Sequence, residues 1–250
     1  MPTYLQNNWF YIFALTCAGL LLLMDPIPQS SMYHHFADQR TCFSIPHFHN
    51  VWTNIPFVAI GVWGLFSTRL SSYPPLLRQI SQILFIGFVL TGLGSGYYHL
   101  DPHNATLLWD RLPMTIIFIS FFSLIFTQAY GLEKGKPIFY FGLPIGILSV
   151  IYWYVTEKAG SGDLRPYVFT QFFPMLALPI ILVSGKRKLQ NMRLIIIILL
   201  CYVIAKVFEH FDHEIMHALS YSGHALKHLA AALAMYFMYR YIGKSTYKAS

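Results

Sequence analysis

Charged residues are scarce in this sequence. Asp, Glu, Lys and Arg make up 11% of the 250 residues, whereas apolar residues make up 56%. Soluble domains carry about a quarter charged residues, because these keep the surface wetted. So few charged side chains cannot cover a water-soluble globule, and the composition therefore favours an integral membrane protein.

Cysteines and N-terminal basic residues are also rare. The chain has three cysteines, Cys17, Cys42 and Cys201, which are far apart in the sequence. This spacing gives no reason to expect a disulfide framework or a thiolate zinc site. No Lys or Arg precedes the first apolar run and no small-residue cleavage site follows it, so we expect a retained membrane span rather than a signal peptide.

Apolar runs of membrane-spanning length recur along the chain. A hydrocarbon core of about 30 Å requires roughly 20 apolar residues per helix. The runs end at Gly, Pro and charge clusters, and no internal repeat divides the chain. The sequence therefore predicts an all-α, polytopic transmembrane helix bundle that forms a single domain over residues 1–250. The predicted spans are 8–24, 50–67, 79–99, 106–130, 137–156, 165–184, 192–214 and 222–242.

Basic residues in the predicted loops lie mostly on one side of the membrane. Because cytoplasmic loops are enriched in Lys and Arg, this asymmetry predicts that both termini are cytoplasmic. It also accounts for the net charge of +7, which therefore gives no reason to expect a nucleic-acid partner. The basic residues on the predicted cytoplasmic side are Arg69, Arg78, Lys134, Lys136, Lys186, Arg187, Lys188, Arg193, Arg240, Lys244 and Lys248, and those on the other side are Arg40, Lys158 and Arg165.

Ionisable residues within the predicted spans gather at one end of the bundle. Such groups are costly in lipid, so by default they mark function and face the bundle interior. The predicted topology brings three polar clusters from distant parts of the sequence to the extracytoplasmic end, where they can form one site. The clusters are Ser95, His99, Asp101, His103 and Asp110; Lys206, Glu209, His210, Asp212, His213, Glu214 and His217; and His224, Lys227 and His228.

Two histidine pairs near the C-terminus have the i, i+4 spacing that places both rings on one helix face. His213 and His217 belong to the string "HEIMH", which has the pattern of zinc proteases. However, the sequence has no acidic residue after His217 to complete an intramembrane protease site. His224 and His228, joined by His99 from another helix, would instead give three protein ligands and an open fourth position, as in catalytic zinc sites.

Several stretches of the sequence resemble the alkaline ceramidases. "GSGYYHLDPHNATLLWDRLPM" resembles their Ser-x-x-x-His and Asp-x-Leu-Pro-Met stretch, and "GHALKHLAAALAMY" resembles their C-terminal His-x-x-x-His helix. "FHNVWTNIPF", with Asn50 and Asn54, is similar to the start of their first core helix, and Asp212 falls where they carry an aspartate. The resemblance covers about residues 36–240. It implies a seven-helix core, to which the segment 8–24 adds an N-terminal helix.

The resemblance implies a zinc-dependent membrane amidase. Such an enzyme would hydrolyse the amide bond of a ceramide-like lipid to a long-chain base and a fatty acid. His99, His224 and His228 would bind Zn²⁺. Asp110 would act as general base, and Ser95 would donate a hydrogen bond to the developing oxyanion.

Three residues of the seventh predicted span are expected to surround this site. His210, Asp212 and His213 would orient the zinc ligands and hold Asp110 or the neighbouring lysines. Hydrogen-bond partners of metal ligands commonly have this role, because they fix the ring orientation and the protonated nitrogen of each histidine.

The chain departs from the animal ceramidases before the first core helix. Where those enzymes carry an acidic calcium cluster, "FADQRTCFSIPHFHN" offers only Asp38, and His47 stands at an acid position. This departure argues against calcium regulation. The same stretch resembles the bacterial branch of the family. That resemblance implies a bacterial inner-membrane protein whose active site lies toward the extracytoplasmic face.

Three other functions fit part of the sequence. A lipid receptor or sensor of the same superfamily would hold zinc structurally, with a closed fourth position and no released fatty acid. An intramembrane protease would use "HEIMH". A transporter would need a polar path through the whole bilayer, yet the cytoplasmic half of each predicted helix is nearly free of charge. The sequence gives no indication of the oligomeric state.

Overall fold

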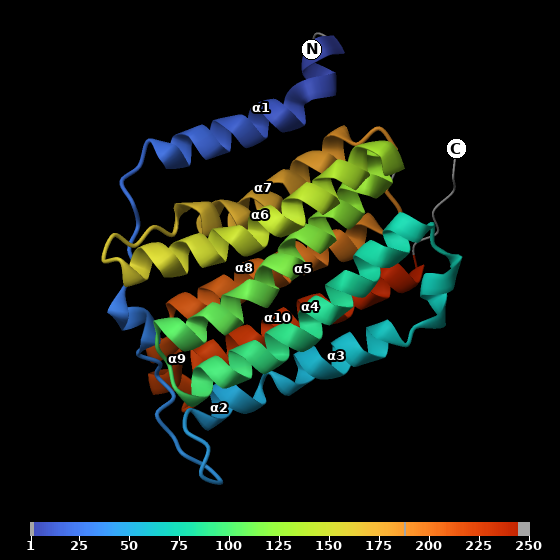
Figure 1. Cartoon of the computed structure of the whole chain (residues 1–250). Helices are drawn as coiled ribbons and strands as arrows, with labels where there is room; N and C mark the ends of the chain where they lie inside the picture. Colours follow the sequence, from blue (N-terminus) through green and yellow to red (C-terminus); the bar gives the residue numbers. More distant parts are fainter. Residues whose placement is uncertain (1–2, 188, 245–250) are drawn as a thin grey trace.

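The protein is a bundle of α-helices (Figure 1). The computed structural model describes residues 3–187 and 189–244, and within these ranges the chain forms helices and no β-strand. The α-helices are α1 (Thr3–Leu22), α2 (Phe48–Trp52), α3 (Ile55–Leu65), α4 (Pro75–Leu100), α5 (Asn104–Tyr130), α6 (Leu132–Lys158), α7 (Arg165–Ser184), α8 (Met192–His210), α9 (Asp212–Leu219) and α10 (Gly223–Lys244). Two 3₁₀ helices, η1 (Ser31–His34) and η2 (Thr68–Ser72), lie in the connections.

The long helices have the length and composition of membrane spans. Four of them, α4 to α7, are long and apolar enough to cross a bilayer, and the bent pair α8 and α9 forms a fifth candidate. Of these four, α5 is the most buried and α6 the least. Large apolar side chains such as Leu15, Phe141 and Val183 remain exposed on the outside of the bundle, as expected of a surface that faces lipid. The prediction of an all-α, polytopic membrane bundle is confirmed.

The structure differs from the predicted spans at two places. The predicted span 50–67 is divided into α2 and the short helix α3. The predicted span 192–214 ends at His210, where the chain bends by 80° into α9. Two further predicted spans, 8–24 and 222–242, are not among the helices that qualify: the apolar part of α1, Trp9–Leu22, is too short, and α10 does not combine the length of a span with its hydropathy.

The helices run back and forth, so the connections gather at two ends of the bundle. One end, here called the site end, carries residues 23–47, 101–103, 159–164 and α9, whereas the start of α4 and the end of α10 lie at the opposite end (Figure 1). Two basic residues that the sequence assigns to the cytoplasmic side, Lys188 and Lys248, lie outside the described residues.

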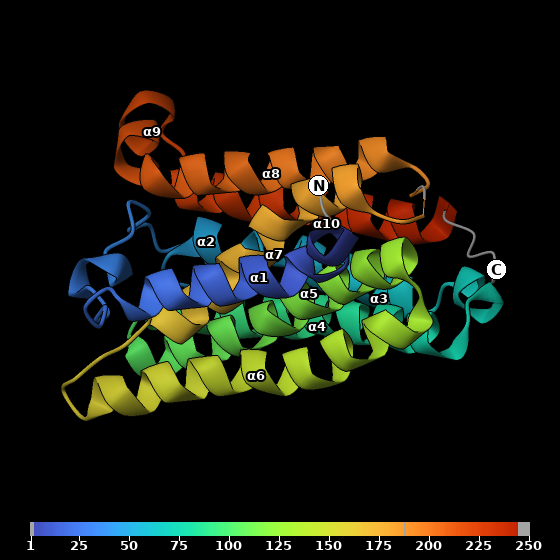
Figure 2. The ribbon, with the colours of Figure 1, turned by 90° about the horizontal axis from the view of Figure 1, so that it is seen from above.

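Helix pairs α4–α5 and α8–α10 form the closest packing in the bundle, and Figure 2 shows α8 and α10 side by side along their length. Glycine permits close approach at two points. A Cβ on Gly94 of α4 would lie 2.1 Å from the carbonyl oxygen of Trp109 in α5, and one on Gly223 would lie 2.5 Å from that of Phe208 in α8. These contacts bring the polar ends of the four helices together.

Helix α1 packs on the outside of the bundle against α7 (Figure 2). Phe10 is the only core residue it contributes among its described side chains, and its ring meets those of Phe122, Phe126 and Phe173. The indole nitrogen of Trp9 donates a hydrogen bond to the Tyr130 hydroxyl over 3.1 Å. The N-terminal helix is therefore an addition to the outside of the bundle rather than part of its centre.

Candidate metal centre

Three histidines from two helices form a compact triangle at the site end. His99 lies in the last turn of α4, and His224 and His228 lie in the first turns of α10. The ring centroids are 4.9 Å apart for His99 and His224, 5.0 Å for His99 and His228, and 4.9 Å for His224 and His228. One ligand atom from each ring lies within 4.8 Å of the others, and all three side chains are buried.

The hydrogen bonding of His99 fits a bound cation. Both of its ring nitrogens are buried and have no hydrogen-bond partner. A buried polar atom without a partner costs about 1–3 kcal/mol, so native structures rarely leave two on one side chain. A metal ion that accepts a nitrogen lone pair removes part of this cost, and three neutral imidazoles are a common ligand set for such an ion. The donor set therefore fits a metal.

Thr53 fixes the protonation of His228. The Thr53 hydroxyl donates to the carbonyl oxygen of His49 over 2.7 Å, so its single proton is already used. The hydroxyl lies 2.9 Å from Nδ1 of His228 and can only accept there. Nδ1 of His228 therefore carries the proton, and Nε2 presents a lone pair to the other two histidines.

Asp212 anchors the start of α10. Its Oδ1 accepts hydrogen bonds from the backbone N–H of His224 and from the Ser222 hydroxyl, each over 2.8 Å. Its Oδ2 accepts from the backbone N–H of Ala37 over 2.9 Å. The carboxylate thus joins the helix that carries two of the histidines to the segment that covers them.

The segment 25–39, here called the cap segment, covers the histidines at the site end. The ring of Phe36 lies 4.6 Å from that of His99 and 4.4 Å from that of His224, measured between centroids. The Tyr33 hydroxyl donates to Glu209 on α8. The cap segment therefore separates the histidines from the medium at this end.

His34 ties the cap segment to α4 and α5. Its Nε2 lies 2.9 Å from the side-chain oxygen of Asn104, and its Nδ1 lies 2.8 Å from the Tyr98 hydroxyl. Burial lowers the pKa of His34 below its ordinary value, which favours the neutral ring that donates to Asn104 and accepts from Tyr98. These contacts are therefore complete near neutral pH.

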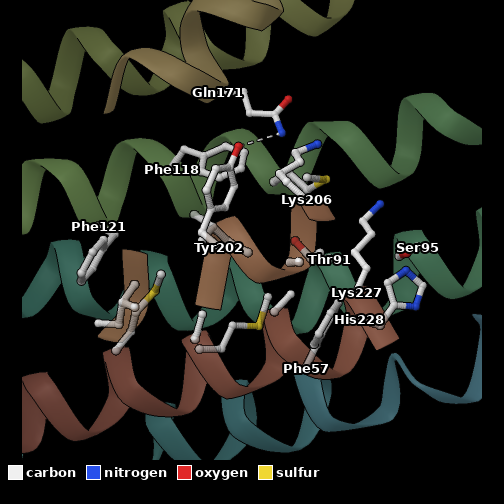
Figure 3. A pocket seen from close by; sticks show the side chains of 18 of the residues that line it. Phe57, Thr91, Ser95, Phe118, Phe121, Gln171, Tyr202, Lys206, Lys227 and His228 are labelled. Atoms are coloured by element: carbon white, nitrogen blue, oxygen red, sulfur yellow. Dashed lines mark hydrogen bonds between the residues drawn. The ribbon is translucent and has the colours of Figure 1, made fainter. Parts of the chain in front are cut away.

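A cavity extends from the histidines along the inside of the bundle, between α4, α5, α7, α8 and α10 (Figure 3). Ser95, Asp110 and His228 line it near the site end, and Ser95 is a hydrogen-bonding neighbour of the Asp110 carboxylate. Toward the opposite end the walls become apolar. These walls include Met114, Phe118, Phe121, Ile198, Met235 and Met238.

A comparison with known families identifies the chain. The family model described as Ceramidase matches residues 40–248. The chain belongs to the ceramidase family. Searches of curated proteins and of solved structures found no match.

Membership implies a membrane hydrolase with a lipid substrate such as ceramide. The region matched to the ceramidase family contains the three histidines, Ser95 and Asp110. It begins after α1 and the cap segment.

The other residues predicted for the site separate into two groups. Asp212 is buried and bonded to His224, as described above. His210 and His213 are exposed, and His213 hydrogen-bonds the carbonyl oxygen of His35. For His213 the reason is the bend after His210, because it turns α9 away from the direction in which α8 would have continued. The structure thus brings Asp212, but not His210 or His213, to the histidine triangle.

The remaining residues of "HEIMH" also lie away from the triangle. Glu214 and His217 are exposed on α9. Among the described residues, the one group of three that could hold a metal is His99, His224 and His228. This geometry gives no support to a protease site in α9.

Asp38, the single acidic residue of the stretch compared with the animal calcium cluster, is paired with an arginine. Its fully buried carboxylate accepts from Nε of Arg40 over 3.0 Å and from the backbone N–H of His49 over 2.8 Å. Arg40 also contacts Nδ1 of His49 over 3.0 Å. A guanidinium therefore neutralises Asp38.

Sequence reasoning missed Phe36 and Thr53. Phe36 lies in a loop whose path the hydropathy pattern does not define. Thr53 did leave a signal, because it is a polar residue between Asn50 and Asn54 at the start of an otherwise apolar run.

Proposed function

We propose that this protein is a zinc-dependent membrane amidase that hydrolyses the amide bond of a ceramide-like lipid to a long-chain base and a fatty acid. The observation that carries the proposal is the pair of unpartnered nitrogens on buried His99, which faces His224 and His228 beside an apolar cavity. Membership of the ceramidase family supports the reaction class.

The metal is assigned as zinc from the chemistry of the donors. Zinc binds imidazole nitrogens well, and its catalytic sites commonly have three protein ligands and an open position. When bound, the ion would polarise the amide carbonyl and lower the pKa of a water molecule. His99, His224 and His228 would hold it, with Thr53 and Asp212 fixing the positions of two of these rings.

Asp110 is assigned as the general base. Its carboxylate lines the cavity beside His228, where it can take a proton from the attacking water and pass it to the leaving amine. Ser95 is assigned as the donor to the carbonyl oxygen. Once Asp110 is protonated it accepts less strongly from Ser95, which frees the single hydroxyl proton for the negative charge that develops on that oxygen.

The cavity supports a lipid substrate. Its walls beyond Ser95 and Asp110 are mainly apolar, although Gln171, Tyr202, Lys206 and Lys227 also line it. An acyl chain lying against the apolar walls would gain about 0.8 kcal/mol per buried CH₂ group. The amide would then lie at the polar end of the cavity, beside Asp110 and the histidines. One acyl chain of the lipid would therefore lie along the length of the cavity, away from the histidines.

We assign the site end to the extracytoplasmic face of a bacterial inner membrane and both termini to the cytoplasm. The basic residues at the opposite end support this orientation, since Lys and Arg are retained on the cytoplasmic side. Those within the described residues include Arg78, Lys134, Lys136, Lys186, Arg187 and Arg193.

The reaction is tested by measuring fatty-acid release from ceramide with the purified protein in lipid nanodiscs, using mass spectrometry. Removing the metal with a chelator should abolish release, and zinc should restore it. Asp110→Asn should keep the metal and lower turnover by about 100-fold to 10,000-fold, which is the contribution of a general base. Glu214→Gln, which changes the acidic residue of "HEIMH", should leave turnover unchanged.

Three outcomes would overturn the proposal. Undiminished release from protein shown by elemental analysis to be metal-free would remove the metal from the reaction. Full turnover by Asp110→Asn would place the base elsewhere. Metal binding without hydrolysis of any N-acyl lipid would favour the sensor alternative.

A further inference from the structure

Two lysines that the proposed mechanism does not use share one carboxylate beside the histidines. Nζ of Lys206 on α8 lies 2.5 Å from Oε2 of Glu209, and Nζ of Lys227 on α10 lies 2.6 Å from Oε1. Oε1 also accepts from the Tyr33 hydroxyl over 3.3 Å. Both oxygens of Glu209 are therefore occupied, and one anion serves two cations.

The local charge is unbalanced. Two ammonium groups against one carboxylate leave one positive charge in excess. The Glu209 and Lys227 side chains are largely buried, and the Lys206 side chain is 35% exposed. Among the described residues, Asp110 is the one acidic side chain that lines this cavity, and it forms no ion pair with either lysine. Excess charge at a buried site is costly unless a counter-charge is available. An anionic ligand would supply that counter-charge.

Each of the two ammonium groups also has N–H donors left over to bind a ligand. Each has three N–H donors, and Lys206 uses one of them on Glu209. Lys227 uses one on Glu209 and lies 3.4 Å from Nε2 of His224. Both lysines line the cavity, which they enter from different helices (Figure 3). Their remaining donors can therefore reach a group placed between them.

We propose that Lys206 and Lys227 form a binding site for the anionic oxygens at the end of a lipid chain held in the cavity. The anion is either the carboxylate of the released fatty acid or an acidic group on the head of the substrate. The inference rests on the proposed function for the presence of that chain. The two lysines are specificity residues, because an uncharged chain end cannot replace the missing counter-charge.

The direct test is binding by metal-depleted protein, since chelation removes any contact between the ligand and an ion. Palmitate and hexadecanol, which share a chain length and differ in charge, are compared as competitors of a fluorescent fatty acid. Wild-type protein should bind palmitate about tenfold more tightly, as expected for one or two charge-assisted hydrogen bonds. Lys206→Met should lose this preference, and Lys206→Arg should retain it.

The variants are chosen to keep the fold. Lys206→Met leaves Glu209 paired with Lys227, so no buried carboxylate is left alone. Unchanged hexadecanol binding reports an intact cavity in each variant. Lys136→Met removes an exposed lysine from α6 and should change the binding of neither palmitate nor hexadecanol. Glu209→Gln should tighten palmitate binding, because both ammonium groups lose their competing partner.

Turnover distinguishes the two sources of the anion. If the site holds the product, palmitate should inhibit the wild type more strongly than Lys206→Met. If it holds an acidic head group, Lys206→Met should raise KM for a sulfonated N-acyl substrate and not for ceramide. Either result supports the lysine site.

Equal binding of palmitate and hexadecanol by the wild type would overturn the inference, and so would an unchanged preference in Lys206→Met. A palmitate preference without amidase activity would overturn the proposed function and leave the lysine site standing. Amidase activity without that preference would overturn the lysine site alone.

Discussion

The two histidine pairs of the C-terminal region have the same spacing in the sequence but different surroundings in the structure. His213 and His217 lie on α9 and are exposed, whereas His224 and His228 lie on α10 and are buried against His99. Both pairs place two rings on one helix face, so the local pattern does not separate them. The difference teaches that the i, i+4 spacing alone does not define a metal site. A third ligand from another helix and burial of the rings are also needed.

Packing at the start of α10 explains why the second pair is buried. Gly223 lets the chain approach the carbonyl oxygen of Phe208, and Asp212 bonds the backbone N–H of His224. α10 then runs back along α8 into the bundle. α9, in contrast, is a short helix that follows an 80° bend.

The largest expected effect separates the two pairs directly. His228→Ala should lower bound zinc to background, because two imidazoles cannot complete a three-ligand site. His217→Ala should bind zinc as the wild type does. Elemental analysis of the purified proteins measures both. Loss of zinc from His217→Ala with zinc retained by His228→Ala would reverse the assignment of the pairs.

Substitution of Asp212 should lower zinc affinity less than loss of a histidine ligand does, and more than substitution of its neighbours on α9 does. Asp212→Asn replaces an accepting oxygen with an N–H₂ group that opposes a backbone donor, so zinc affinity should fall by about 10-fold to 100-fold. Zinc competition with a chelating dye measures this. Asp101→Asn, at an exposed carboxylate, is the matched control. Equal zinc affinities for the two variants would show that Asp212 does not support the metal site.

Thr53 offers a finer test, because it acts on one ring nitrogen. Thr53→Val removes the acceptor of the Nδ1 proton of His228, and zinc affinity should fall by about tenfold. Thr53→Ser keeps the hydroxyl and should retain the wild-type affinity. The same dye competition applies. An affinity of Thr53→Val that matches Thr53→Ser would show that the hydroxyl does not orient the ring.

The smallest effect is expected at His213. His213→Ala removes one exposed hydrogen bond to the carbonyl oxygen of His35, so the loss of stability should stay below about 1 kcal/mol. Zinc affinity should not change. Thermal unfolding in detergent, with and without zinc, measures both quantities. A fall in zinc affinity would restore His213 to the surroundings of the metal, as the sequence had suggested.

Hydropathy was sufficient to predict the membrane helix bundle, and alternation of the helices placed Ser95, His99 and Asp110 at the same end as the C-terminal histidines. The exposure of His213 could not be predicted, since the 80° bend replaces a helix that the apolar pattern continued to residue 214. The positions of Phe36 and Thr53 depend on loop path and on single hydrogen bonds. Neither a loop path nor a single hydrogen bond produces a periodic pattern in the sequence.

The Phe36 ring also bears on the order of events during synthesis. The polypeptide that covers the histidines is made before them, and it can settle only after the last helix has been inserted beside the first ones. Until that moment the pocket is open to water and ions. We therefore expect closure over the histidines to be a late step of biogenesis, and exchange of an ion bound there to be slow in the finished protein.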